Sequence, residues 1–314
     1  MIDQLTVTVN EIKAQLQCQE GKKSDFCNVC ADGYEKTEAG ECVKARSKFS
    51  FYRSLTIGEY VFLLDPKILV VGGGPGVQLK TELWPKSKKQ CNLADFPIAV
   101  YADAVGFNIA QGPVICGGLV TTSRPTRITT TTTGAAATTA ASTSLMENRC
   151  FILKHRHWMP FFNMTTTRWR ASATEINNDQ TLIIGGRDEN WNYLKTTELI
   201  SSRGTEKGKD FPVTIQDHCT FKINATHAMV TGGHQGGSSY SADAWYVDLS
   251  TTTFTPGPTM NVRRSSHGCS IVHLGTKTYG VVSGGYGHGR YLHSTEWIDL
   301  DQESPRWTEG MQVK

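Results

Sequence analysis

The sequence predicts an all-β fold built from repeated sheets, and two observations lead to this prediction. A short apolar run that ends in two glycines recurs five times along the 314 residues, at intervals of 45, 68, 47 and 52 residues. Intervals in this range are typical of repeat proteins. After most pairs comes a stretch of alternating apolar and polar residues, the pattern of a half-buried strand. The glycine pairs are Gly72 and Gly73, Gly117 and Gly118, Gly185 and Gly186, Gly232 and Gly233, and Gly284 and Gly285.

Each repeat is expected to contain four strands. The apolar run is the second of them, and it stops at two glycines because the backbone has to bend sharply there and approach a neighbour closely. A fourth strand then leads into a proline or methionine and an arginine before the next repeat. The third strands are expected at residues 81–84, 197–200, 243–249 and 295–300.

Four strands, with Gly-Gly after the second and aromatic residues after the third and in the fourth, resemble the kelch repeat. The aromatic pair of that family is clearest at Phe151 and Trp158. Two repeats depart from it and carry Asp-Phe-Pro, around Phe96 and Phe211, where a tryptophan is expected. The resemblance covers about residues 50–314 and implies a β-propeller of four-stranded blades, so we assign residues 47–314 to that domain.

Five glycine pairs leave three interpretations of the ring: a closed five-bladed propeller, an open ring, or part of a longer protein. We expect the last of these, an incomplete six-bladed ring, because the N-terminal residues also lack the apolar core of a signal peptide. The long interval between Gly118 and Gly186 has a visible cause. Residues 121–144 are almost entirely Thr, Ala, Ser and Gly, and we expect a disordered loop there, after the second strand of its blade.

The N-terminal segment, residues 1–46, is rich in cysteine and separate from the repeats. Its cysteines are Cys18, Cys27, Cys30 and Cys42. The run from Cys27 through Gly33-Tyr34 to Cys42 resembles the later half of an EGF-like module, although that family has two more cysteines. The resemblance implies disulfides among these four, with three connectivities open. The alternatives are free thiols or a zinc site, for which Cys27-x-x-Cys30 supplies only half of the usual ligands.

Composition excludes several classes of protein. The 32 basic and 29 acidic residues give a net charge of +3 without a basic cluster, which disfavours a nucleic-acid partner. No apolar run is long enough to span a membrane. The Gly72–Gly76 segment looks like a dinucleotide-binding turn, but Val77 stands where that motif needs its third glycine.

Cysteine usage and two Asn-x-Thr sequences favour an extracellular or secreted protein, with a cytoplasmic one as the alternative. The candidate glycosylation sites are Asn163 and Asn224. Cys219 and Cys269 occupy matching repeat positions, so we expect a neighbouring strand to bring one of them near Cys116 or Cys150. Because nine cysteines is an odd number, at least one thiol is expected to be free or bonded outside the chain. In the cytosol the five later cysteines would be buried thiols.

No catalytic residue, metal ligand or cofactor is predicted. Copper oxidases built on kelch-like blades use tyrosines, histidines and a cysteine, but no spacing here reproduces that set. His218 and His267 begin two repeats at equivalent places, and we interpret them as histidines that bond a neighbouring strand. The arginines that precede first strands are expected to bond backbone carbonyls, with ligand binding as the alternative: Arg168, Arg263 and Arg264.

The predicted function is that of a non-enzymatic interaction protein, which binds a protein or glycan through loops on one propeller face. The alternatives are an intracellular kelch adaptor of a ubiquitin ligase and, less favoured, a galactose-oxidase-like copper enzyme. The loops expected to bind span residues 74–80, 187–195, 234–241 and 286–293. The candidate contact residues are Trp191, Tyr193, His234, Tyr240, Tyr286, His288 and Tyr291, with packing between blades as the alternative role of the tyrosines.

Overall fold

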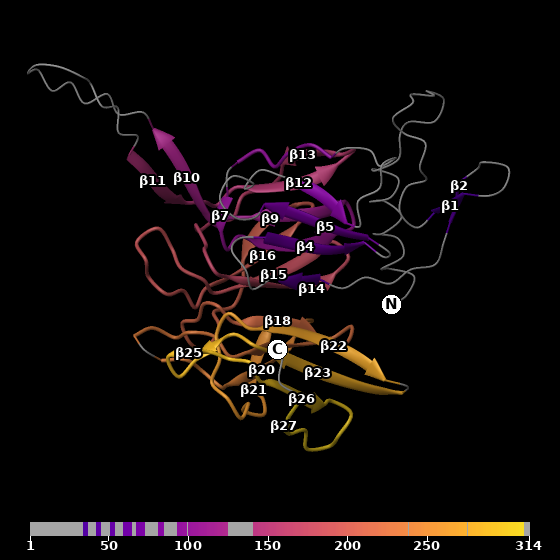
Figure 1. Ribbon diagram of the computed structural model, residues 1–314, viewed down its shortest axis with the longest axis vertical. Helices are drawn as coiled ribbons and strands as arrows, with labels where there is room; N and C mark the ends of the chain where they lie inside the picture. Colours follow the sequence, from indigo (N-terminus) through magenta and orange to yellow (C-terminus); the bar gives the residue numbers. More distant parts are fainter. Residues whose placement is uncertain are drawn as a thin grey trace, which may run out of the picture.

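The computed structural model describes residues 34–36, 42–44, 51–53, 59–64, 67–72, 81–84, 93–98, 100–124, 141–237, 239–274 and 276–310. These residues form strands, turns and loops (Figure 1). They contain no helix that is long and apolar enough to cross a membrane. The all-β prediction is therefore confirmed for the described part of the chain.

Five antiparallel four-stranded sheets, numbered here in chain order, make up most of this structure, and in each sheet the strands lie in chain order. The first sheet contains β3 (Phe51–Arg53), β4 (Glu59–Leu64), β5 (Lys67–Gly72) and β6 (Thr81–Trp84). The second contains β8 (Val105–Ile109), β9 (Gly112–Cys116), β12 (Cys150–Lys154) and β13 (His157–Pro160). The third contains β14 (Ser172–Asn177), β15 (Gln180–Ile184), β16 (Thr197–Ser201) and β17 (Gly204–Lys207). The fourth contains β18 (Cys219–Lys222), β19 (His227–Thr231), β20 (Ala244–Asp248) and β21 (Thr253–Pro256). The fifth contains β22 (Gly268–Leu274), β23 (Lys277–Ser283), β26 (Thr295–Asp299) and β27 (Trp307–Glu309).

Three smaller sheets complete the described strands. One pairs β1 (Tyr34–Lys36) with β2 (Cys42–Lys44) in the cysteine-rich segment. Another joins β7 (Val100–Ala102), β10 (Leu119–Arg124) and β11 (Ala141–Met146). The last is the hairpin of β24 (Tyr286–Gly287) and β25 (Arg290–Tyr291).

The five large sheets meet through their first strands. β8 contacts β14, β14 contacts β18, β18 contacts β22, and β22 contacts β3. In Figure 1 the fourth and fifth sheets, in orange and yellow, lie below the others. This arrangement of successive sheets is consistent with a blade-like fold.

Apolar side chains fill the spaces between neighbouring sheets. The second strand β15 is covered on both of its faces, and this explains why its sequence is continuously apolar. In β15, Ile183 faces the core shared with the second sheet, whereas Leu182 and Ile184 face the core shared with the fourth sheet. All three side chains are fully buried. A strand that is covered on both faces has no position left for a polar residue, so the alternation expected of a half-buried strand disappears there.

In the second to fifth sheets the glycine pair follows the second strand directly, and all eight of these glycines have a left-handed φ; in the first sheet Gly72 ends β5, and Gly73 lies outside the described residues. At Gly185 and Gly186 the backbone φ angles are 61° and 95°, in the left-handed region that favours glycine. A Cβ atom on Gly185 would lie 2.3 Å from the carbonyl oxygen of Ile215. That same carbonyl accepts a hydrogen bond of 2.8 Å from the Gly186 amide. The corner of one sheet therefore docks directly onto the loop that enters the next sheet.

The Thr/Ala-rich insertion is more ordered at its ends than the sequence predicts. Residues 119–124 pair in register with residues 141–146 as β10 and β11, and this hairpin extends away from the large sheets (Figure 1). The expected disordered loop at 121–144 is therefore too long by four residues at each end, because threonine and serine are compatible with a strand once a partner strand is available. Residues 125–140 lie outside the described residues.

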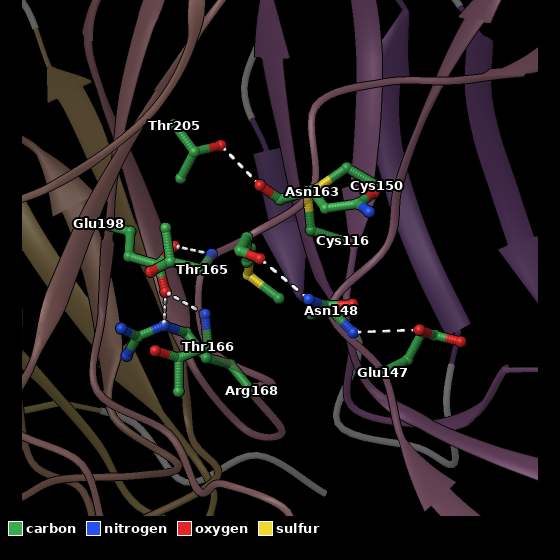
Figure 2. Close-up of a disulfide and its surroundings, with 11 residues drawn as sticks. Cys116, Glu147, Asn148, Cys150, Asn163, Thr165, Thr166, Arg168, Glu198 and Thr205 are labelled. Carbon is green, nitrogen blue, oxygen red and sulfur yellow. Dashed lines mark hydrogen bonds and ion pairs between the residues drawn. A yellow bond between two sulfur atoms is a disulfide. The ribbon is translucent and has the colours of Figure 1, made fainter.

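Two disulfides connect strands of the described structure. Cys116 and Cys150 are directly opposed on β9 and β12, with Cα atoms 4.0 Å apart (Figure 2). Cys219 on β18 is bonded to Cys269 on β22, which joins the fourth sheet to the fifth. The expectation that Cys219 or Cys269 would approach Cys116 or Cys150 is wrong, because matching positions on adjacent first strands are themselves neighbours. All the cysteines whose side chains are described form these two bonds.

A buried arginine–glutamate ion pair connects the loop before the third sheet to the second and third strands of that sheet. Arg168 Nε lies 2.8 Å from Glu198 Oε1, and each side chain is 1% exposed (Figure 2). Arg168 also donates to the carbonyl oxygens of Gly185 and Thr196, while Glu198 accepts from the amides of Thr165 and Thr166. The expected bonds from Arg168 to backbone carbonyls are therefore present, and the side chain is directed into the protein.

The fifth sheet repeats this network and the fourth replaces it. Arg264 and Glu296 are fully buried and 2.7 Å apart, in positions equivalent to those of Arg168 and Glu198. In the fourth sheet the strand registers place Ile215 and Trp245 at these positions. Both charges are thus exchanged together for apolar side chains, as the high cost of a single buried charge requires.

The two Asp-Phe-Pro segments replace the missing tryptophans by packing on the following sheet. The ring of Phe96 contacts Phe151 and Trp158, with centroids 5.4 and 4.9 Å apart. The ring of Phe211 contacts Trp245 and Phe254 in the same edge-to-face manner, at 5.5 and 4.9 Å. Aromatic residues therefore seal the joint between sheets at both places.

Candidate binding site

The loops that follow the glycine pairs form an extension at one end of the third, fourth and fifth sheets. In each of these sheets, the residue just after the glycine pair forms a β-bridge with the strand-entry loop, which is the loop that leads into the first strand of the sheet. The chain then turns back and pairs with the other side of that residue. The equivalent bridges are Trp169 to Arg187 to Tyr193, Gln216 to His234 to Tyr240, and Ser265 to Tyr286, with Tyr286 paired to Tyr291. The sequence predicted that these loops share one face, and the bridges explain how each loop is held to its sheet.

The side chains of these extensions touch one another across the three sheets, and we call the connected set Trp191, Tyr193, His234, Tyr240, Tyr286 and Tyr291 the aromatic arc. The ring of His234 lies 5.4 Å from Tyr193 and 5.0 Å from Tyr240. Tyr240 continues to Tyr286 at 5.6 Å, and Tyr286 to Tyr291 at 5.4 Å. The Tyr193 hydroxyl and His234 Nδ1 are hydrogen-bonded at 2.8 Å.

Arg187 joins Trp191 to the rest of the arc. Its guanidinium lies 4.1 Å from the centre of the Tyr193 ring and 5.7 Å from that of Trp191. Trp191 also meets Trp169 edge to face at 5.2 Å. The ends of the arc are its most exposed parts, since Trp191 is 52% and Tyr291 79% exposed. Such large aromatic side chains are enriched at interaction hot spots.

A row of four polar residues, which we call the polar row, borders the arc where successive sheets meet, and the sequence analysis did not anticipate it. Each member precedes a first strand by two positions and has a left-handed φ between 50° and 62°: Asp103, Arg170, Asp217 and Ser266. The amide of each of the last three donates to the carbonyl of the member before it, at 2.7–3.1 Å. Arg170 is also paired with both aspartates. The only sequence signal was the shared position before the first strand.

The environment of His234 disfavours the protonated form of its imidazole. Partial burial lowers the pKa of its imidazole, the positive charges of Arg187 and Arg170 act in the same direction, and the Asp217 carboxylate opposes them. A neutral imidazole can form the hydrogen bond with the Tyr193 hydroxyl and pack against the two tilted tyrosine rings without the cost of a partly buried cation.

Other predicted site residues lie elsewhere. His288 is exposed in the turn between β24 and β25, and no arc contact involves it. Arg263 is exposed, and Arg264 is part of the buried network. His267 Nε2 is hydrogen-bonded to Thr231 Oγ1 on the neighbouring sheet at 2.9 Å, as interpreted. His218 is buried.

Several predictions fall on residues that the structure does not describe. The loop at 74–80 is among them, as are Cys18, Cys27 and Cys30 and the side chain of Cys42.

The candidate glycosylation sites Asn163 and Asn224 are described, and both are exposed. Within the described residues, no three His, Cys, Asp or Glu side chains gather as metal ligands do.

The sequence matches no protein-family model, and the search of curated proteins found no match to it.

Proposed function

We propose that the protein is an extracellular kelch-type β-propeller and a non-enzymatic scaffold that binds a protein or glycan through the face bearing the aromatic arc. The observation that carries this proposal is the contact of tyrosine and histidine side chains across the loops of three successive sheets. Rigid scaffolds commonly place recognition on such loops. In this proposal the five large sheets are blades, and the contact of β22 with β3 places the first sheet beside the fifth, as expected if no further blade lies between these two.

The two disulfides support an extracellular setting over a cytosolic adaptor of ubiquitin ligases, because cytosolic thiols are normally kept reduced. They also weigh against a copper oxidase with a tyrosine–cysteine cross-link. The cysteines whose side chains are described are already bonded to each other, which leaves no thiol among them for a tyrosine.

An N-glycan is expected on Asn224 when the protein is expressed in a eukaryotic secretory pathway. Asn224 lies in the turn between β18 and β19, and its Oδ1 accepts hydrogen bonds from the backbone amide of Thr226 at 2.9 Å and from the Thr226 hydroxyl at 3.0 Å. This turn brings the acceptor amide and the required hydroxyl together. Intact mass should fall by one glycan in Asn224→Gln and Thr226→Ala but not in Thr226→Ser. An unchanged mass in Asn224→Gln would contradict the prediction.

The binding face is tested by Tyr291→Ala, which removes the most exposed ring of the arc. Biosensor measurements against immobilised panels of extracellular proteins and glycans should show at least about a tenfold loss of affinity for any partner of the wild-type protein. Leu274→Ala is the matched control, because Leu274 is 64% exposed at the opposite end of the fifth sheet. Equal losses in both variants, or no loss in Tyr291→Ala, would refute the assignment of this face.

A further inference from the structure

Arg187 forms no ion pair with any carboxylate of the described structure. Nearby, Arg170 is paired with Asp103 and Asp217, and Arg168 with Glu198, whereas the described residues supply no carboxylate to Arg187. Its Nε atom is buried and has no hydrogen-bond partner there, and the same holds for Nε1 of Trp169, a residue only 8% exposed. A partly exposed arginine that forms no ion pair is a candidate binding partner for an anionic group.

Trp191 stands beside this arginine in a conformation that tryptophan rarely adopts. Its φ angle is 64°, in the left-handed region, and its side chain is half exposed. The loop is held by Asp188, whose Oδ1 accepts from the amides of Asn190 and Asn192 at 2.9 and 2.8 Å. Glycine or asparagine would satisfy this turn with less strain. A bulky aromatic residue at such a position therefore points to a role for its exposed ring in function.

We propose that Trp191 and Arg187 form a subsite for a sugar residue that carries a carboxylate, such as a uronic or sialic acid. This inference rests on the proposed function and names the chemistry of its ligand. The apolar C–H face of the sugar ring stacks on the Trp191 indole, and the carboxylate pairs with the Arg187 guanidinium in the fork geometry that arginine favours. An acidic peptide would use the arginine but leave the exposed indole without a partner, so the pair of side chains favours the sugar.

The test measures binding of the intact protein to immobilised β-glucuronide, α-sialoside and neutral β-galactoside. At least one acidic sugar should bind about tenfold more tightly than the neutral one. Arg187→Met should remove this preference, and Trp191→Gly should abolish binding without lowering the melting temperature, because glycine relieves the left-handed strain. Arg203→Met is the matched control: Arg203 is exposed in the turn between β16 and β17, at the other end of the same sheet, and its loss should change nothing.

Three results would overturn the inference, and they separate it from the proposed function. Equal binding of acidic and neutral sugars, unaffected by Arg187→Met, would retain a glycan-binding face but refute the carboxylate subsite. Binding of a glutamate-rich peptide through Arg187, without binding of either acidic sugar, would show that the subsite serves a protein partner. If no sugar or peptide binds and Tyr291→Ala also leaves every partner unaffected, both the subsite and the binding face are refuted.

Discussion

Replacing Arg168 with methionine should lower the free energy of unfolding by about 3–5 kcal/mol, because the buried Glu198 carboxylate then loses its cation. Both side chains are 1% exposed, and the pair connects the strand-entry loop to the glycine corner of the third sheet. Denaturant unfolding followed by tryptophan fluorescence would measure the change. Arg263→Met is the matched control, since Arg263 is exposed in the equivalent loop of the fifth sheet, and it should alter the free energy by less than about 0.5 kcal/mol.

The double variant Arg168→Met with Glu198→Leu should be more stable than Arg168→Met alone. The fourth sheet already carries Ile215 and Trp245 at these positions, so the architecture accepts an apolar pair there. Recovery is expected to be partial, because the amides of Thr165 and Thr166 lose their acceptor. A double-mutant cycle isolates the coupling of the two side chains. Additive losses, or a cost below about 1 kcal/mol for Arg168→Met, would contradict this view of the network.

Removal of the disulfide between the fourth and fifth sheets, in Cys219→Ala with Cys269→Ala, should cost about 4 kcal/mol. This value follows from the loop entropy released when a link across 50 residues is lost. Denaturant midpoints of the wild-type and double-alanine proteins would measure it. Cys116→Ala with Cys150→Ala removes a link across 34 residues within one sheet and should cost slightly less.

Alkylation followed by mass spectrometry gives an independent check of both bonds. In protein purified from an oxidising compartment, these cysteines should react only after reduction and unfolding. Peptides that carry modified Cys219 or Cys269 before reduction would contradict the structure and would remove the main support for an extracellular setting.

Much of the fold could be predicted because the pattern that defines it is local. The expected third strands at 197–200 and 295–300 lie within β16 and across β26, and Gly185 and Gly186 stand at the corner where a sharp bend was expected. Strand periodicity and left-handed glycines depend on the residues themselves. The limits of the 121–144 insertion were misjudged for the opposite reason, since Thr and Ser become strand residues only when a partner strand lies alongside.

The candidate site was predictable in its membership but not in its connections. Exposed aromatic residues in the loops after the glycine pairs pointed to Tyr193, Tyr240 and Tyr291, and the structure links each of them into one arc. The contribution of Arg187 was not anticipated, because an arginine in a loop carries no sequence signal about whether a carboxylate will approach it. The ion pairs of Arg170 with Asp103 and Asp217 in the polar row were not anticipated either, since the shared position of these residues before a first strand does not show which of them will meet.

Sequence alone was sufficient to establish that this chain is built from repeated antiparallel sheets, since the period of its apolar runs and the glycines that end them express backbone geometry directly. The tertiary structure decided which side chains from different repeats meet. It paired Cys219 with Cys269, buried Arg168 against Glu198, and left Arg187 beside Trp191 without an acidic partner among the described residues. Such contacts depend on how neighbouring sheets are placed in space, and residues about fifty positions apart carry no local record of that placement.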